Sequence, residues 1–243
     1  MKPIYVLSVR QLAGKWRLLV LLVLAAVPPL LGLLASAGSN KPTRFDLGDT
    51  LLDGLVASAV LPIIVLAVAT AALGNELEDK TLANLTLTPL SRWRIVVAKL
   101  AAALTVALPP LVAGTVGGVL VAFAAAGLGG AGRAALAAAV GVSIGALMYS
   151  TVFLWAGLVT AHPLAFGLLY VFVWEGLFAS FVNGIKYLSI RQYTLGLIGA
   201  IDPSQFSPDR KLVGTAAAGT GAAIVFVAFL LLTVRRLRTM DVP

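Results

Sequence analysis

The stretch 74–94 carries the highest density of ionisable side chains in the chain and separates two long apolar segments. Asn75 is a favoured helix N-cap, and Glu78 follows three residues later, as in a capping box. Glu76 and Glu78 would place negative charge in a first turn, where the helix dipole stabilises it. Pro89 would end the helix. The spacing predicts a short, capped helix over 75–89.

One face of this expected helix is apolar. Leu77, Thr81, Leu85 and Thr88 recur at helical spacing, and Leu82 is adjacent. A short helix with an acidic start and an apolar ridge suits insertion into a groove on a soluble partner. The chemistry of this segment is therefore binding, not catalysis.

Glu175 is the second candidate, because it lies inside an apolar segment, between Trp174 and Gly176. An ionisable group at that depth is costly and usually faces a helix bundle or a cavity. Two interpretations are open: a contact for substrate or a proton, or a neutral or hydrogen-bonded glutamate that joins helices or subunits.

Other catalytic and metal chemistry lacks the residues it needs. The chain has no cysteine and a single histidine, His162, whose place before Pro163 favours a solvated turn residue over a pH sensor. No Gly-x-x-x-x-Gly-Lys-Ser/Thr loop occurs, so any ATP must be hydrolysed by another polypeptide. No cofactor or metal is expected on this chain, and an intramembrane enzyme would need clustered catalytic groups that the apolar segments lack.

The composition indicates a lipid environment. Hydrophobic residues make up 60% of the 243 residues, charged residues only 12%, and the mean hydropathy is +0.99, whereas soluble domains average about 25% charged residues. The net charge of +8 does not point to nucleic acid, because the basic residues are spread between apolar runs. We therefore expect membrane lipids, and no nucleic acid, among the partners.

The expected fold is an all-α membrane protein with six transmembrane helices. Residues 1–17 mix apolar and basic side chains and predict an N-terminal interfacial helix. Residues 183–211 alternate apolar and polar groups, as in an extracytoplasmic re-entrant segment between spans five and six. Pro109 and Pro110 should kink or break the third span. The expected spans are 18–37, 51–73, 95–126, 134–160, 164–182 and 212–234.

The distribution of Lys and Arg favours cytoplasmic N- and C-termini. With that orientation eleven basic residues fall inside and seven outside, in agreement with the positive-inside rule. The chain is then a multi-pass protein of the cell's inner (plasma) membrane. Gly114 and Gly118, and likewise Gly141 and Gly145, have the spacing of closely packed membrane helices.

The segment after the second span resembles the signature of type-2 ABC exporter permeases. The residues that carry the resemblance are Glu76, Glu78, Thr81, Leu82, Leu85, Pro89 and Ser91. In that family the pattern reads Glu-x-Glu-x-Gly-Thr-Leu-Glu-x-Leu-x-x-x-Pro-x-Ser. Lys80 replaces the usual glycine, and Ala83 stands where an acid is usual.

The resemblance implies a permease subunit that pairs with a second permease, as a homodimer or heterodimer, and docks on ABC nucleotide-binding ATPase subunits that hold ATP-Mg. It also implies that Glu76, Glu78, Thr81, Leu82, Leu85 and Pro89 form the coupling helix. The nearly uncharged spans favour export of a hydrophobic or amphipathic substrate. The alternatives are an ion- or proton-coupled secondary transporter that uses Glu175, and an ABC-like scaffold that signals through its ATPase.

Overall fold

A computed structural model describes residues 2–37, 42–78, 91–160, 162–178 and 187–239, and within them every regular element is helical. This confirms the all-α prediction for the described part of the chain. The elements are α1 (Lys2–Leu12), α2 (Lys15–Ala37), α3 (Arg44–Asp46), η1 (Leu47–Val60), α4 (Leu61–Glu78), α6 (Arg92–Ala126), α7 (Ala131–Val159), α8 (Pro163–Leu169), η2 (Tyr170–Phe178), α10 (Ile190–Ile201), η4 (Pro203–Gln205) and α11 (Thr215–Thr239).

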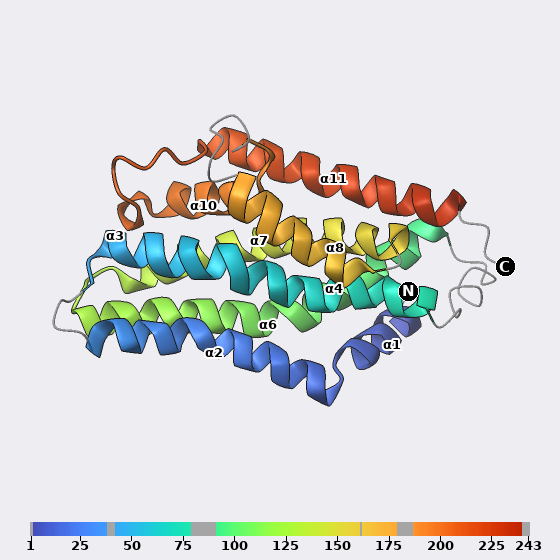
Figure 1. The fold of residues 1–243 in the computed structure, drawn as a ribbon, viewed down its shortest axis with the longest axis horizontal. Helices are drawn as coiled ribbons and strands as arrows, with labels where there is room; N and C mark the ends of the chain where they lie inside the picture. Colours follow the sequence, from blue (N-terminus) through green and yellow to red (C-terminus); the bar gives the residue numbers. More distant parts are fainter. Residues whose placement is uncertain (1, 38–41, 79–90, 161, 179–186, 240–243) are drawn as a thin grey trace.

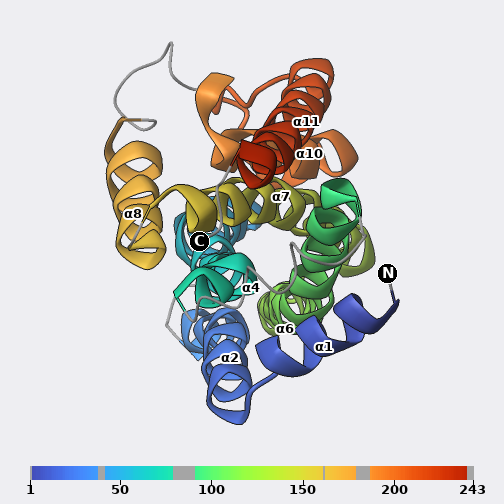
Figure 2. The ribbon, with the colours of Figure 1, turned by 90° about the vertical axis from the view of Figure 1, so that its right-hand side faces the viewer.

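The long helices lie side by side in an elongated bundle (Figure 1). Helix α7 occupies the centre, where it packs against α4, α6, α10 and α11, and α2 packs on α6 from the outside (Figure 2). We call the end that holds α1, Glu78, Arg92 and Thr239 the terminal end. The opposite end, with α3, the turn at 127–130 and η4, is the distal end.

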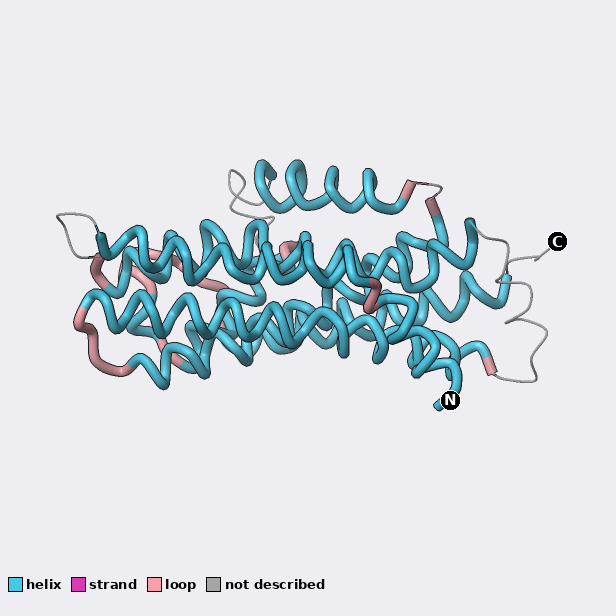
Figure 3. Tube along the Cα trace, turned by 90° about the horizontal axis from the view of Figure 1, so that it is seen from below, coloured by secondary structure: helices cyan, strands magenta, loops and turns pink. Residues whose placement is uncertain are grey.

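Within the described residues, five helices are long and apolar enough to cross a membrane: Lys15–Ala35, Arg44–Gly74, Arg92–Ala126, Ala131–Val159 and Thr215–Thr239. The expected fifth span, 164–182, is the exception. Its described part, α8 with η2, would be about 24 Å long at 1.5 Å per residue, shorter than the roughly 30 Å hydrocarbon core. Figure 3 shows this segment as a short helix along one side of the bundle.

Helix α10 follows α8 and η2 in the chain. It lies between α7 and α11 in the distal half of the bundle, with Leu195 and Ile198 fully buried (Figure 1). The part of the chain expected to form a re-entrant segment, 183–211, therefore contains a buried helix of 12 residues.

Of the expected kink or break at Pro109 and Pro110, the break is wrong, and so is the expected extent 1–17 of the N-terminal helix. Pro109 and Pro110 do not break α6, which runs through both, as α2 runs through Pro28 and Pro29. A proline removes one backbone hydrogen bond, and packing in a membrane bundle tolerates that loss. The N-terminal helix ends at Leu12, and Lys15 already belongs to α2. Helix α1 packs on α6, where the Tyr5 hydroxyl lies 2.9 Å from Thr105 Oγ1.

The glycine spacings do mark close helix packing, as predicted. A Cβ on Gly114 would lie 2.2 Å from the Ala25 carbonyl oxygen of α2, and one on Gly118 would lie 2.8 Å from Pro28 Cβ. On α7, Gly141 and Gly145 admit Ile198 and Thr194 of α10 at similarly short distances. These glycines let α2 approach α6, and α10 approach α7.

Helix α6 provides a matched test of this packing. Gly114→Ala is expected to lower the free energy of unfolding by about 1–3 kcal/mol, because the new methyl group overlaps the backbone of α2. Gly117→Ala is the control, since a Cβ there meets nothing within 4 Å and helix propensity should raise stability by up to about 1 kcal/mol. Thermal unfolding in detergent, followed by tryptophan fluorescence, measures both; equal effects would contradict the close approach.

Candidate functional site

The expected coupling segment is bounded by two helix ends that lie together at the terminal end. Helix α4 ends at Glu78 and α6 begins at Arg92, with Ser91 as its N-cap residue. The expected N-cap at Asn75 is wrong, because the α4 backbone stays helical through that residue to Glu78. No proline separates the second span from the acidic run, so the helix continues.

The remaining predicted coupling residues lie outside the described part of the chain. This holds for Thr81, Leu82, Leu85 and Pro89, and for the side chains of Glu76 and Glu78. Their role as coupling residues therefore stays a prediction. The structure fixes only the anchors of the segment, at the end of α4 and the start of α6.

Glu175 lies in η2 and is 1% exposed. Its carboxylate accepts hydrogen bonds from the Tyr170 hydroxyl at 3.2 Å, from the Ile190 backbone N–H at 2.9 Å and from the Ser189 hydroxyl. Ser189 in turn is the N-cap of α10, accepting a hydrogen bond from the Gln192 N–H. A carboxylate at a helix N-terminus is favoured by the exposed N–H groups and by the helix dipole.

These hydrogen bonds agree with the second interpretation of Glu175, a hydrogen-bonded glutamate that joins helices. The side chain joins η2 to the first turn of α10. The carboxylate thus starts a helix inside the bundle, where water could not satisfy the free N–H groups.

An ion cluster lies next to this junction, at the side of α10 that faces η1. Asp53, which is 6% exposed, accepts from Arg191 Nε at 2.5 Å and also pairs with Arg210. Arg210 bridges to Asp49, one turn earlier on η1, and Ser207 Oγ lies 3.4 Å from the same carboxylate. We call Asp49, Asp53, Arg191 and Arg210 the distal ion cluster.

The winding of η1 helps to place these acids. The Leu61 N–H donates to the Val56 carbonyl, five residues back, so the segment is wider than an α-helix. Such π-helical windings are rare and often occur at functional sites. Among the described residues, the π-segments η1 and η2 carry the buried acids Asp53 and Glu175, respectively.

The distal ion cluster ties three parts of the chain together: η1, α10 and the segment before α11. Burial lowers the pKa of Arg210, but hydrogen bonds and charges from Asp53 and Asp49 raise it by more, so the net pKa is raised. Arg210 therefore stays charged at every physiological pH. The arrangement connects elements of the distal end that are far apart in sequence through ion pairs.

Sequence reasoning missed this cluster. Asp53 falls within the expected second apolar span, and Arg191 and Arg210 enter the sequence-based expectations only as topology signals. The available signal was the same one that singled out Glu175: an acid within a segment that must cross lipid. What the sequence could not supply was the partner, which is more than 130 residues away along the chain.

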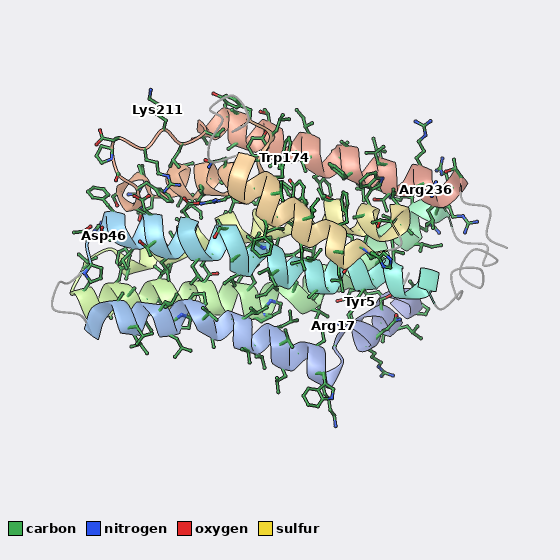
Figure 4. The ribbon with its side chains drawn as sticks, in the orientation of Figure 1. Tyr5, Arg17, Asp46, Trp174, Lys211 and Arg236 are labelled. Carbon is green, nitrogen blue, oxygen red and sulfur yellow. The ribbon has the colours of Figure 1, made fainter. Side chains whose placement is uncertain are left out.

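Other cations of the distal end are also held by hydrogen bonds. Arg44 donates to the Gly129 carbonyl at 2.5 Å and to Ser204 at 3.2 Å, and Arg133 Nε donates to the Ile201 carbonyl at 2.9 Å. At the terminal end, by contrast, the last turns of α11 carry the exposed residues Arg235, Arg236 and Arg238. Figure 4 labels Arg236. The arginines named at the distal end are thus held by hydrogen bonds, whereas those at the end of α11 are exposed. His162 is exposed in the turn before α8, as expected.

The long apolar helices and the buried acids define a multi-pass membrane protein. A family model described as ABC-2 family transporter protein matches residues 15–187, which includes α2 to η2 and ends before α10. The chain belongs to this family of transporter membrane proteins, and the predicted resemblance is confirmed. Members typically lack the ATPase domain, and membership implies a partnering ATPase. A comparison with curated proteins found no match.

Proposed function

We propose that this chain is the permease subunit of an ATP-driven exporter, coupled by residues 75–89 to a separate ABC ATPase. One observation carries the proposal: the two helix ends that flank the acidic signature segment, the end of α4 and the start of α6, lie at the terminal end of the bundle. Glu76, Glu78, Thr81, Leu82, Leu85 and Pro89 are the residues that would contact the ATPase.

The proposed orientation places the terminal end, and so both termini, in the cytoplasm. Support comes from the contrast between the two ends. At the distal end Arg44, Arg133, Arg191 and Arg210 are engaged with carboxylates or carbonyl groups. The arginines of the α11 terminus are exposed, and free cations next to helix ends are the ones that set topology.

The proposed transmembrane domain has six crossings, with α1 as the interfacial helix and α8 with η2 opening the fifth crossing. Helix α10 belongs to the re-entrant segment, which enters the bundle from the extracytoplasmic side and meets Glu175. Two such subunits, identical or different, would form the transport pathway in the inner membrane, and each would bind an ATPase that carries ATP-Mg. The apolar spans suit a hydrophobic or amphipathic substrate.

Co-purification tests the proposal. The tagged chain is expressed together with a candidate ABC ATPase and purified in mild detergent. The ATPase should elute with the chain, and its ATP hydrolysis should change when the permease is bound. Transport into liposomes driven by an ion gradient, with no ATPase present, would instead support a secondary transporter.

Glu175 distinguishes these alternatives. Glu175→Gln is expected to keep ATP-dependent transport within about twofold of the parent, because an amide still fills the space and can accept from Ile190. Glu175→Leu should lower the free energy of unfolding by about 1–3 kcal/mol, because the Ile190 N–H and the hydroxyl groups of Tyr170 and Ser189 lose their acceptor. Transport assays and thermal unfolding check both. Complete loss of transport in a stably folded Gln variant would favour a proton-carrying glutamate.

A further inference from the structure

A lateral groove of about 610 Å³ opens at the terminal end, between the start of α2, the second half of α4 and the start of α8. Helix α4 forms its floor with Ala67, Thr70, Ala71 and Gly74. In the end-on view α4 lies between α2 and α8, which form the two sides (Figure 2). The small floor residues make the groove: a Cβ on Gly74 would already touch Pro163 Cγ at 3.5 Å.

The groove combines an apolar floor with a cationic rim. Val20 of α2 and Leu164 of α8 line it and are 49% and 54% exposed. Arg17 lies on the rim, in the first turn of α2 and at the same end of the bundle as Arg236 (Figure 4). Among the described residues, no hydrogen bond or ion pair engages the Arg17 side chain.

Arg17 and its neighbour Trp16 lie at the membrane depth where a phospholipid has its headgroup. Arg17 is the third residue of a helix that begins at Lys15, so it lies where α2 leaves the hydrocarbon core for the headgroup layer. Trp16, next to it, is 83% exposed, as for an interfacial tryptophan. From Gly74 to Ala67 the floor extends about 10 Å along α4, long enough for the first carbons of an acyl chain.

A second copy of the chain would satisfy the groove less well. Helix α2 contains no Asp or Glu, and the one acid of α8 and η2, Glu175, is buried in its own hydrogen bonds. A copy that packed through these faces would therefore bring no carboxylate to Arg17. An anionic phospholipid supplies both the missing negative charge and the apolar chain.

We propose that this groove binds one anionic phospholipid, with its phosphate at Arg17 and His162 and an acyl chain along the α4 floor between α2 and α8. The proposal is independent of ATPase coupling. It assigns a ligand site to a surface of the permease alone, in the leaflet at the terminal end.

Trp16 lines the groove, so its fluorescence can report lipid binding there. Replacing Trp93, Trp155 and Trp174 by Phe leaves it as the only tryptophan of the four in the chain. The variant is placed in nanodiscs of phosphatidylcholine with a small fraction of brominated phosphatidylglycerol or brominated phosphatidylcholine. The proposal predicts stronger quenching by the brominated phosphatidylglycerol, saturating at a low mole fraction.

Two matched pairs of variants define the site. Arg17→Gln should weaken the apparent affinity for phosphatidylglycerol about fivefold, the effect of one cation near a headgroup. Arg10→Gln, which changes an exposed residue of α1, should not. Ala67→Leu fills the floor and should reduce quenching, whereas Ala26→Leu, on the exposed face of α2, should not.

Two outcomes overturn the proposal. Equal quenching by the two brominated lipids, unchanged in Arg17→Gln, means that the groove makes only ordinary lipid contact. Quenching by neither lipid, restored only in nanodiscs that hold a single chain, means that a second copy covers the groove. No ATPase enters this measurement, so either outcome leaves the proposed coupling untouched.

Discussion

Asp53→Ala is expected to lower the free energy of unfolding by about 3–5 kcal/mol, the cost of leaving buried partner charges without their counter-ion. Asp53 is 6% exposed and is shared by Arg191 and Arg210. Removing it leaves Arg191 without its carboxylate partner, and Arg210 with Asp49 alone, at the place where η1 meets α10. Thermal or denaturant unfolding in detergent measures the loss.

The neighbouring acid supplies the control. Asp49→Ala removes a side chain that is 37% exposed and pairs with Arg210 alone, so we expect a loss of about 1 kcal/mol or less. Replacing Asp53, Arg191 and Arg210 together by residues of similar size should recover part of the stability, because no buried charge is left unpaired. Similar losses for Asp49→Ala and Asp53→Ala would show that Asp53 is not the central acceptor of the distal ion cluster.

Reversing the charge of Glu76 and Glu78 to Lys should reduce co-purification of the ATPase at least tenfold, equivalent to about 1.4 kcal/mol or more of binding free energy. If these acids face a complementary surface on the ATPase, two new cations would repel it. Affinity purification with a fixed amount of ATPase and quantification of the bound fraction gives the result.

Asp209→Lys is the matched control, because it reverses an exposed acid at the distal end. It should leave ATPase binding unchanged, as should Asp53→Ala in protein that remains folded. Unfolding temperatures of the Glu76 and Glu78 variants within a few degrees of the parent would show that the effect is on docking. Undiminished ATPase binding after both reversals would argue against an acidic contact.

The sequence predicted the helical class and most crossings because apolar length is a local property. A run such as 95–126 is too long and too apolar for a soluble protein, and it appears as α6 (Arg92–Ala126). The close helix packing at the glycine pairs could also be predicted, because a small-x-x-x-small spacing on one helix face permits close approach whichever helix is the neighbour.

The parts that escaped prediction depend on contacts between distant residues. The burial of the helix at 190–201 could not be predicted from nearby residues, because its first turn is capped by Glu175, from another element, as well as by the local N-cap Ser189. The distal ion cluster likewise needs Asp53 to meet Arg191, which is a property of the packed bundle. The expected N-cap at Asn75 failed for the opposite reason: a favourable local motif was overridden by the continuation of α4.

A single engineered cysteine tests the central claim most directly, because the chain has none of its own. Leu85→Cys is combined with the ATPase in native membranes and treated with a short thiol-reactive cross-linker, and Gly129→Cys at the distal end serves as the control. We predict a cross-link to the ATPase from the Leu85→Cys variant only, together with labelling of its thiol from the cytoplasmic side. If the thiols of the two variants were labelled from the same side of the membrane, and neither formed a cross-link to the ATPase, the account would be contradicted.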